Sequence, residues 1–110
     1  MNVANCEKEH LLLKIENSFP TAFPCIKNVL FSANAIQEIR FIQNRLLTFK
    51  ELTLHQSILD KEEISRSYAV LTSSEKKLAK KGVAALTQAI DDIDTLIEQY
   101  HQLSKLQKLY

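Results

Sequence analysis

The 110-residue chain has one glycine, two prolines and no tryptophan. A phosphate-binding loop needs several glycines close together, so nucleotide-binding folds built on such loops are excluded. Glycine and proline are also the main residues of tight turns, and their scarcity leaves little turn chemistry. Leu, Ile, Lys, Glu and Gln dominate instead, which is a composition typical of helical proteins. The sequence therefore predicts an all-α protein.

The chain also lacks an excess of either charge, because fourteen basic and thirteen acidic side chains leave a formal net charge of +1. Composition alone therefore gives nucleic acid no support as a partner. No apolar run approaches the roughly 18 residues that cross a membrane, and Leu11–Leu13 lacks the basic region that precedes a signal peptide core. We expect a cytoplasmic protein with one domain, residues 1–110, and no membrane partner.

There are only two cysteines, Cys6 and Cys25, and neither has the flanks of a secreted disulfide framework. We interpret both as reduced side chains that act as small apolar groups. A disulfide would also be unnecessary, because long helices can hold a bundle together without one. The cysteine content therefore agrees with an intracellular site of folding.

Three residue pairs have spacings that occur in metal sites. Two match the Glu-x-x-His ligand pair of di-iron helical bundles, and one places a cysteine and a histidine on adjacent helical turns. The Glu-x-x-His pairs fall off the apolar faces of their helices, and no motif supplies the remaining ligands of any site. The sequence predicts no metal, cofactor, catalytic residue or small-molecule substrate, and hence no enzyme. The pairs are Glu7 with His10, Glu98 with His101, and Cys6 with His10.

Apolar residues at steps of three and four predict helices over residues 5–18, 24–55, 61–71 and 74–109. Pro20 ends the first helix and Pro24 opens the second. Ser32–Asn34 can kink or briefly interrupt the second helix, because short polar side chains compete for backbone hydrogen bonds. Short connections favour antiparallel neighbours. The expected fold is a three- to four-helix antiparallel bundle with a long C-terminal helix over about 74–109.

Two interpretations exist for the boundary between the third and fourth helices. Thr72–Glu75 is a helix-start signal, which follows the similar signal of Asp60 and Glu63. The apolar stripe nevertheless continues across this boundary, and one continuous rod would move the Lys76–Lys81 cluster away from a helix N-terminus, where the helix dipole disfavours cations. We favour a break, because the start signal is local and specific.

A straight helix over 74–109 would be about 50 Å long, whereas a compact globule of this chain has a diameter of roughly 35 Å. The helix must therefore bend, or a second chain must cover its excess length. Gly82 permits either a kink or a close approach of two helices. We predict a homodimer held by coiled-coil packing, and its dimer seam consists of Ala79, Gly82, Val83, Ala85, Leu86, Ala89, Ile90 and Ile93.

Opposite charges are clustered in the C-terminal third of the chain. The Lys76–Lys81 cluster is followed by Asp91, Asp92, Asp94 and Glu98. The simplest interpretation is a solvated face. In an antiparallel dimer, however, Lys80 would lie beside Asp92, and Lys81 beside Asp91, of the second copy. Exposed pairs of this kind would select the register more than they would add affinity.

Phe41 lies off the apolar line of its helix and between two arginines. It either packs against the first helix or joins Leu52 or Leu54 in an exposed apolar patch suited to a partner. We therefore predict a module that binds another protein, as an adaptor, small inhibitor or dedicated chaperone. The alternatives are a nucleic-acid or anionic-surface binder using Lys76–Lys81, and a helical metal or redox protein using Cys6 and His10. The partner-binding candidates are Arg40, Phe41, Arg45, Lys76, Lys77, Lys80 and Lys81.

Overall fold

The computed structural model describes residues 3–55 and 61–108, and the side chains of residues 9–55 and 61–99. Throughout these segments the regular structure is α-helical, which confirms the predicted fold class. The helices follow the order α1 (Val3–Ser18), α2 (Phe23–Ile26), α3 (Ala35–Leu54), α4 (Lys61–Ala69), α5 (Ser73–Lys81) and α6 (Val83–Lys108). None of the helices in the described segments is long and apolar enough to cross a membrane.

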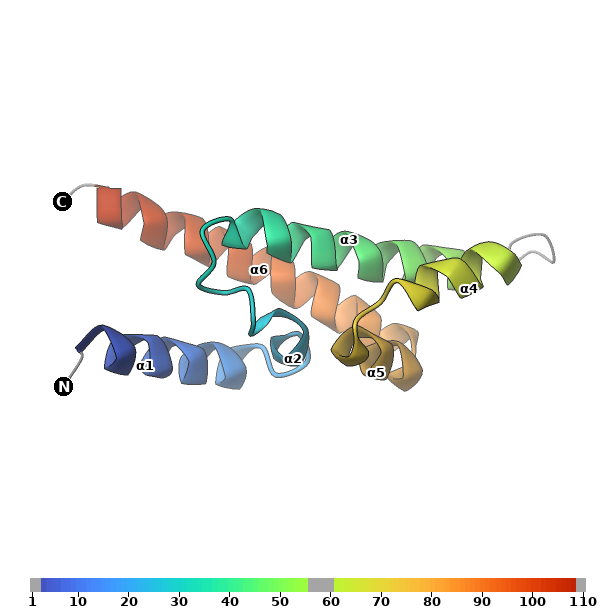
Figure 1. Ribbon diagram of the computed structural model, residues 1–110, viewed down its shortest axis with the longest axis horizontal. Coiled ribbons are helices and arrows are strands. Elements are labelled where there is room, and N and C mark those ends of the chain that lie inside the picture. Colours follow the sequence, from blue (N-terminus) through green and yellow to red (C-terminus); the bar gives the residue numbers. More distant parts are fainter. Residues whose placement is uncertain (1–2, 56–60, 109–110) are drawn as a thin grey trace.

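The two longest helices, α3 and α6, run antiparallel and form the most extensive helix pair of the molecule (Figure 1). α4 packs on α3, α5 packs on α6, and α2 lies against α3 and α5. The molecule measures 56 × 25 × 21 Å and has a radius of gyration of 15.8 Å, against about 13 Å for a compact domain of this length. The bundle is therefore an elongated rod.

The apolar core follows the contact between α3 and α6 and extends to the C-terminal end of α1. Its largest fully buried side chains are Ile26, Leu30, Ile39, Leu46, Leu86 and Ile93, each no more than 1% exposed. Ile15 and Phe19 attach α1 to this core, while Leu13 faces solvent. The predicted end of the first helix before Pro20 is confirmed, because α1 stops at Ser18.

The helix predicted over residues 24–55 is divided into α2 and α3. The interruption allowed for at Ser32–Asn34 is confirmed, but it is longer than predicted because α2 already ends at Ile26. Between α2 and α3, the backbone makes short turns with hydrogen bonds from Val29 N to Ile26 O and from Ser32 N to Val29 O, both across three residues. The Ser32 hydroxyl donates to the Glu38 carboxylate at 2.6 Å. This irregular segment places Leu30 in the core, and the break includes the Ser32–Asn34 stretch where polar side chains compete for the backbone.

The break predicted before the Lys76–Lys81 cluster is confirmed, and the alternative of one continuous rod is wrong. Thr72 is the N-cap of α5: its backbone is extended, and its Oγ1 accepts a hydrogen bond from the Glu75 amide at 3.3 Å. α4 ends at Ala69, two residues before the expected boundary. Asp60, predicted to cap α4, lies outside the described residues.

The expected helix over about 74–109 is also divided, at Gly82. This residue has φ 112° and ψ 179°, a backbone conformation essentially restricted to glycine. The Gly82 amide still donates to Ala79 O, and its carbonyl accepts from Leu86 N, so the two helices join without an intervening loop. The change of direction lets α5 fold against α6 and removes much of the excess length predicted for a single straight helix.

We expect Gly82→Ala to lower the free energy of unfolding by about 1–3 kcal/mol, because an L-residue is strained at this φ and ψ. An added Cβ would meet no atom within 4 Å, so the loss would come from the backbone alone. Urea unfolding measures it, with Ala84→Ser, an exposed position in α6, as a control that changes stability by about 0.5 kcal/mol or less. A fully stable Gly82→Ala with raised helix content would show that α5 and α6 can join.

Candidate partner-binding surface

A buried ion pair joins α3 to α5. Arg45 Nε and Nη2 donate to Glu75 Oε1 and Oε2, both at 2.9 Å, and Thr72 Oγ1 donates to Oε2 at 2.9 Å. The Glu75 side chain is 0% exposed and that of Arg45 is 33% exposed. The pKa of the Arg45 guanidinium is raised above its usual value because it donates hydrogen bonds to Glu75. Arg45, predicted as a partner-binding residue, is therefore largely committed to the interior of the fold.

A second polar network joins α3 to α6. Arg40 Nη1 lies 2.7 Å from both Asp94 Oδ1 and Gln43 Oε1, while Gln43 Nε2 donates to Asp94 Oδ1 at 2.8 Å and to Ile90 O at 3.0 Å. Hydrogen bonds from Gln43, then from Arg40, lower the pKa of Asp94. Arg40 and Asp94 remain about half exposed, whereas Gln43 is buried. Gln43 is not among the residues predicted from the sequence, although a polar residue four positions after Ile39 on the core-facing row signals a buried hydrogen bond.

A shallow depression, which we name the α3/α4 groove, runs between these two helices. Phe41 is 61% exposed and Val70 is 64% exposed. Phe41 belongs to α3 and Val70 directly follows α4, yet both line this depression. The structure thus exposes Phe41 rather than packing it against α1, and joins it with Val70 rather than with Leu52 or Leu54. The lining residues are Phe41, Asn44, Arg45, Thr48, Arg66, Ser67 and Val70.

The α3/α4 groove has no acidic residue in its lining. Arg45 is paired with Glu75. The positive charge that a partner could bind in the groove therefore belongs to Arg66, whose side chain is exposed. Its Nε donates to Glu62 O at 3.4 Å, and it pairs with no carboxylate in the described part of the chain. Positive charge beside exposed apolar surface is suited to an apolar partner segment that carries a carboxylate.

The four lysines predicted to bind a partner lie on α5. Lys77, Lys80 and Lys81 are exposed. Lys76 is half-buried, with Nζ 5.5 Å from the centroid of the Tyr68 ring, within the range of a cation–π contact. Among residues 9–55 and 61–99, no carboxylate forms an ion pair with any of these lysines.

The residues of the predicted dimer seam divide into two groups. Leu86, Ala89, Ile90 and Ile93 are buried in the core of the single chain. They are buried because α6 lies against α3 of the same chain, so a second copy cannot contact them in this fold. The other four, Ala79, Gly82, Val83 and Ala85, are half-buried around the junction of α5 and α6. A homodimer stays a prediction, and in this fold these four residues are the part of the predicted seam that a second copy could still reach.

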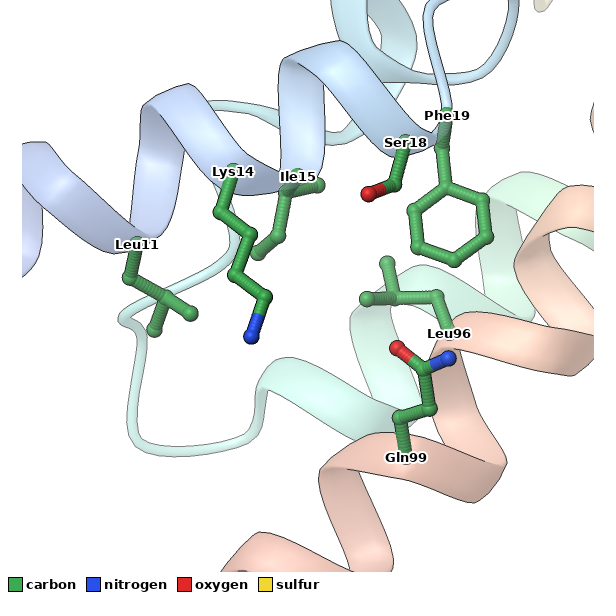
Figure 2. A pocket seen from close by; sticks show the side chains of 7 residues that line it. All are labelled: Leu11, Lys14, Ile15, Ser18, Phe19, Leu96 and Gln99. Atoms are coloured by element: carbon green, nitrogen blue, oxygen red, sulfur yellow. The ribbon is translucent and has the colours of Figure 1, made fainter.

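The described residues hold no group of three or more potential metal ligands of the His, Cys, Asp and Glu types. The side chains of Cys6, Glu7 and His101 lie outside the described set. A small cavity lies between α1 and α6, and Figure 2 shows the side chains that line it. Its volume is about 60 Å³, whereas small-molecule sites usually occupy roughly 300–1,000 Å³. Its lining is mainly apolar, with Lys14 and Gln99 contributing polar groups. This cavity is too small for an organic cofactor.

Cys25 lies half-buried in α2. Burial, followed by the negative charge of Glu75, raises the pKa of its thiol to about 11. The thiol therefore stays protonated at neutral pH, which makes it a poor nucleophile and metal ligand. This environment supports the interpretation of Cys25 as a small apolar side chain.

Comparison of the chain with protein-family models, with curated proteins and with solved structures gives no match. The surface of the chain itself is therefore what indicates a function. Two exposed surfaces of the described residues have distinct chemistry. The α3/α4 groove combines the apolar Phe41 and Val70 with the exposed Arg66, whereas the outer face of α5 carries lysines.

We expect Arg45→Met to lower the free energy of unfolding by roughly 3–5 kcal/mol, because it leaves the Glu75 carboxylate buried without its ionic partner. Arg40→Met is the matched control, since it breaks an ion pair whose side chains are 45% and 58% exposed and should cost at most about 1 kcal/mol. Urea unfolding of both variants provides the comparison. Equal losses in the two variants would show that burial does not distinguish the pairs.

We expect Cys25, in a Cys6→Ser background, to react with iodoacetamide at pH 8 roughly 100-fold more slowly in the folded than in the urea-unfolded chain. The rise of its pKa from 9.0 to about 11 lowers the thiolate fraction by this factor. Because the pKa of this thiol is higher in the folded chain, its contribution to the free energy of unfolding is fully present below pH 9.0 and is lost as pH rises toward about 11. Cys25→Ala should not show this decrease in the free energy of unfolding. Equal alkylation rates in the folded and unfolded states would contradict the raised pKa.

Proposed function

We propose that this protein is a non-enzymatic interaction module that binds a short helical segment of another protein in the α3/α4 groove. One observation carries the proposal: Phe41 and Val70, the two most exposed large apolar side chains of the described residues, line the same depression. Exposed apolar side chains gathered at one place are typical of binding surfaces. Adaptors, small inhibitors and dedicated chaperones all act through contacts of this kind.

The chemistry of the groove indicates the chemistry of its occupant. A depression between two helices accepts an amphipathic helix, whose apolar residues at steps of three and four enter the groove. α4 has nine residues and is therefore about 13 Å long, which corresponds to two or three turns of a partner helix. Arg66 would bind a carboxylate at the edge of that helix, because its guanidinium presents paired donors. We therefore propose an acidic, amphipathic partner helix.

The walls of the groove are held in place by contacts on their inner sides. The Phe49 ring of α3 packs on the Tyr68 ring of α4 at a centroid distance of 5.8 Å. Arg45, at the base of the groove, is fixed by its two hydrogen bonds to Glu75. A surface that is ordered before binding loses less conformational entropy when its partner arrives. This arrangement supports binding to a preformed site.

The proposal is tested by placing a photocrosslinking amino acid at position 41, 70 or 13 in the organism that encodes the chain. Leu13 is the control because it is 56% exposed but lies on α1. We expect one shared crosslinked protein for positions 41 and 70 and none for position 13. The binding helix of that protein is then synthesised and its Kd is measured by calorimetry.

We expect Phe41→Ser to raise this Kd about 30-fold, which is equivalent to about 2 kcal/mol for a central interface residue, and Leu13→Ser to leave it unchanged. Arg66→Ala should weaken binding only of peptides that carry the acidic residue. The proposal is wrong if Phe41→Ser and Leu13→Ser bind the purified helix equally well. A partner helix with basic residues facing Arg66 would contradict its proposed acidic character.

A further inference from the structure

The outer face of α5 carries only positive charge. The helix contains one acidic residue, Glu75, and four lysines. Glu75 is 0% exposed and points inward to the arginine of α3, so its charge is removed from the surface. We name the outer face, formed by the exposed Lys77, Lys80 and Lys81 and bordered by the half-buried Lys76, the lysine face. Within the described residues no carboxylate pairs with it.

This arrangement of lysines has an electrostatic cost. Lys76 and Lys80, and likewise Lys77 and Lys81, are four residues apart on one helix, a spacing at which like charges repel. The helix dipole offsets part of this repulsion only near the C-terminal end, at Lys80 and Lys81. A bound anion would offset the remainder, whereas an isolated solvated helix gains nothing from the arrangement.

We propose that the lysine face binds the phosphate backbone of double-stranded nucleic acid, weakly and without sequence specificity. All four cations are lysines, which act as compact point charges toward phosphate. Arginine, whose planar fork matches a carboxylate, is absent from α5. The lysine face therefore differs from the α3/α4 groove, where an arginine stands beside apolar side chains.

Two other polyanions fit the face less well. A lipid bilayer is bound stably when basic residues act together with an inserted apolar group, but Leu78 of α5 is 4% exposed and therefore directed into the core. Single-stranded nucleic acid is usually held by bases stacked on free aromatic rings. The nearest ring, that of Tyr68, packs on Phe49 and has Lys76 over it. A duplex backbone requires neither insertion nor stacking.

This inference is independent of the proposed function, because the lysine face and the lining of the α3/α4 groove share no residue. The lysine face would let a chain with a net charge of only +1 bind a polyanion. The attraction is local, since charges farther away than about 8–10 Å are screened at physiological salt.

The test measures binding of a fluorescent DNA duplex of about 20 base pairs to the full-length protein by anisotropy as salt is raised from about 50 to 200 mM. Phosphate contacts by the three exposed lysines predict a slope of about −2.7 for log K against log salt, which is a loss of about 40-fold in affinity over this range. Lys77→Gln with Lys80→Gln should leave one such contact and change the slope to about −0.9, which is a loss of about 3.5-fold. Both substitutions relieve repulsion on the surface of α5, so the fold should be retained.

Lys14→Gln with Lys61→Gln is the matched control, because it removes two exposed lysines of α1 and α4 and should leave the slope unchanged. The inference is overturned if the duplex does not bind at about 50 mM salt. It is also overturned if the two double variants weaken the salt dependence of binding equally. Tighter binding to a single strand of equal length, or to vesicles of phosphatidylcholine and phosphatidylserine, would overturn the assignment to a duplex. Partner-helix binding to the α3/α4 groove is unaffected by either result.

Discussion

The pairing of Glu75 with Arg45 is the interaction on which the arrangement of α5 depends. A carboxylate with no exposed surface is costly unless its oxygens have partners, and both oxygens of Glu75 receive hydrogen bonds from the guanidinium. The same carboxylate accepts from the N-cap Thr72, so the start of α5 and its contact with α3 are linked. Any rotation of α5 about its axis would remove Glu75 from Arg45. The pair therefore decides which face of this helix reaches solvent.

The antiparallel contact of α3 with α6 is the second determinant of the structure. It covers the apolar side of α6 with residues of the same chain, and the buried Gln43 links the two helices by donating to Ile90 O and Asp94. Gly82 separates α6 from α5, which lets the shorter helix lie against the longer one (Figure 1). Together these features explain how a chain with few turn residues forms a bundle without one uninterrupted C-terminal rod.

The two exposed surfaces follow from these internal contacts. Because the guanidinium of Arg45 is held by Glu75, this part of the lining of the α3/α4 groove is fixed beside the exposed Phe41 and Val70. Because Glu75 is turned inward, the outer face of α5 retains only its lysines. One buried ion pair thus contributes to the shape of the first surface and to the charge of the second. The chemistry that each surface can recognise is different, since one combines apolar side chains with arginine and the other has lysine alone.

Features that depend on interactions between residues close together in the chain could be predicted from the sequence. Helical periodicity predicted the all-α class, proline predicted the end of α1, and the side chain of Thr72 predicted the start of α5. The position of Phe41 off the apolar line allowed for its exposure, which the structure shows. These predictions succeed because the relevant hydrogen bonds and steric contacts lie within a few residues of one another.

The residues that cover each apolar or charged side chain could not be predicted in this way, because they depend on how the helices pack. Leu86 and Ile93 were correctly expected to be buried, but periodicity does not distinguish α3 of the same chain from a second copy. Arg45 and Glu75 are 30 residues apart in the sequence, and Phe41 is about as far from Val70. Neither pair could be predicted to meet, because each contact forms only when the helices pack. A helical pattern records how strongly a side chain favours burial, whereas the identity of its neighbour depends on how the helices pack.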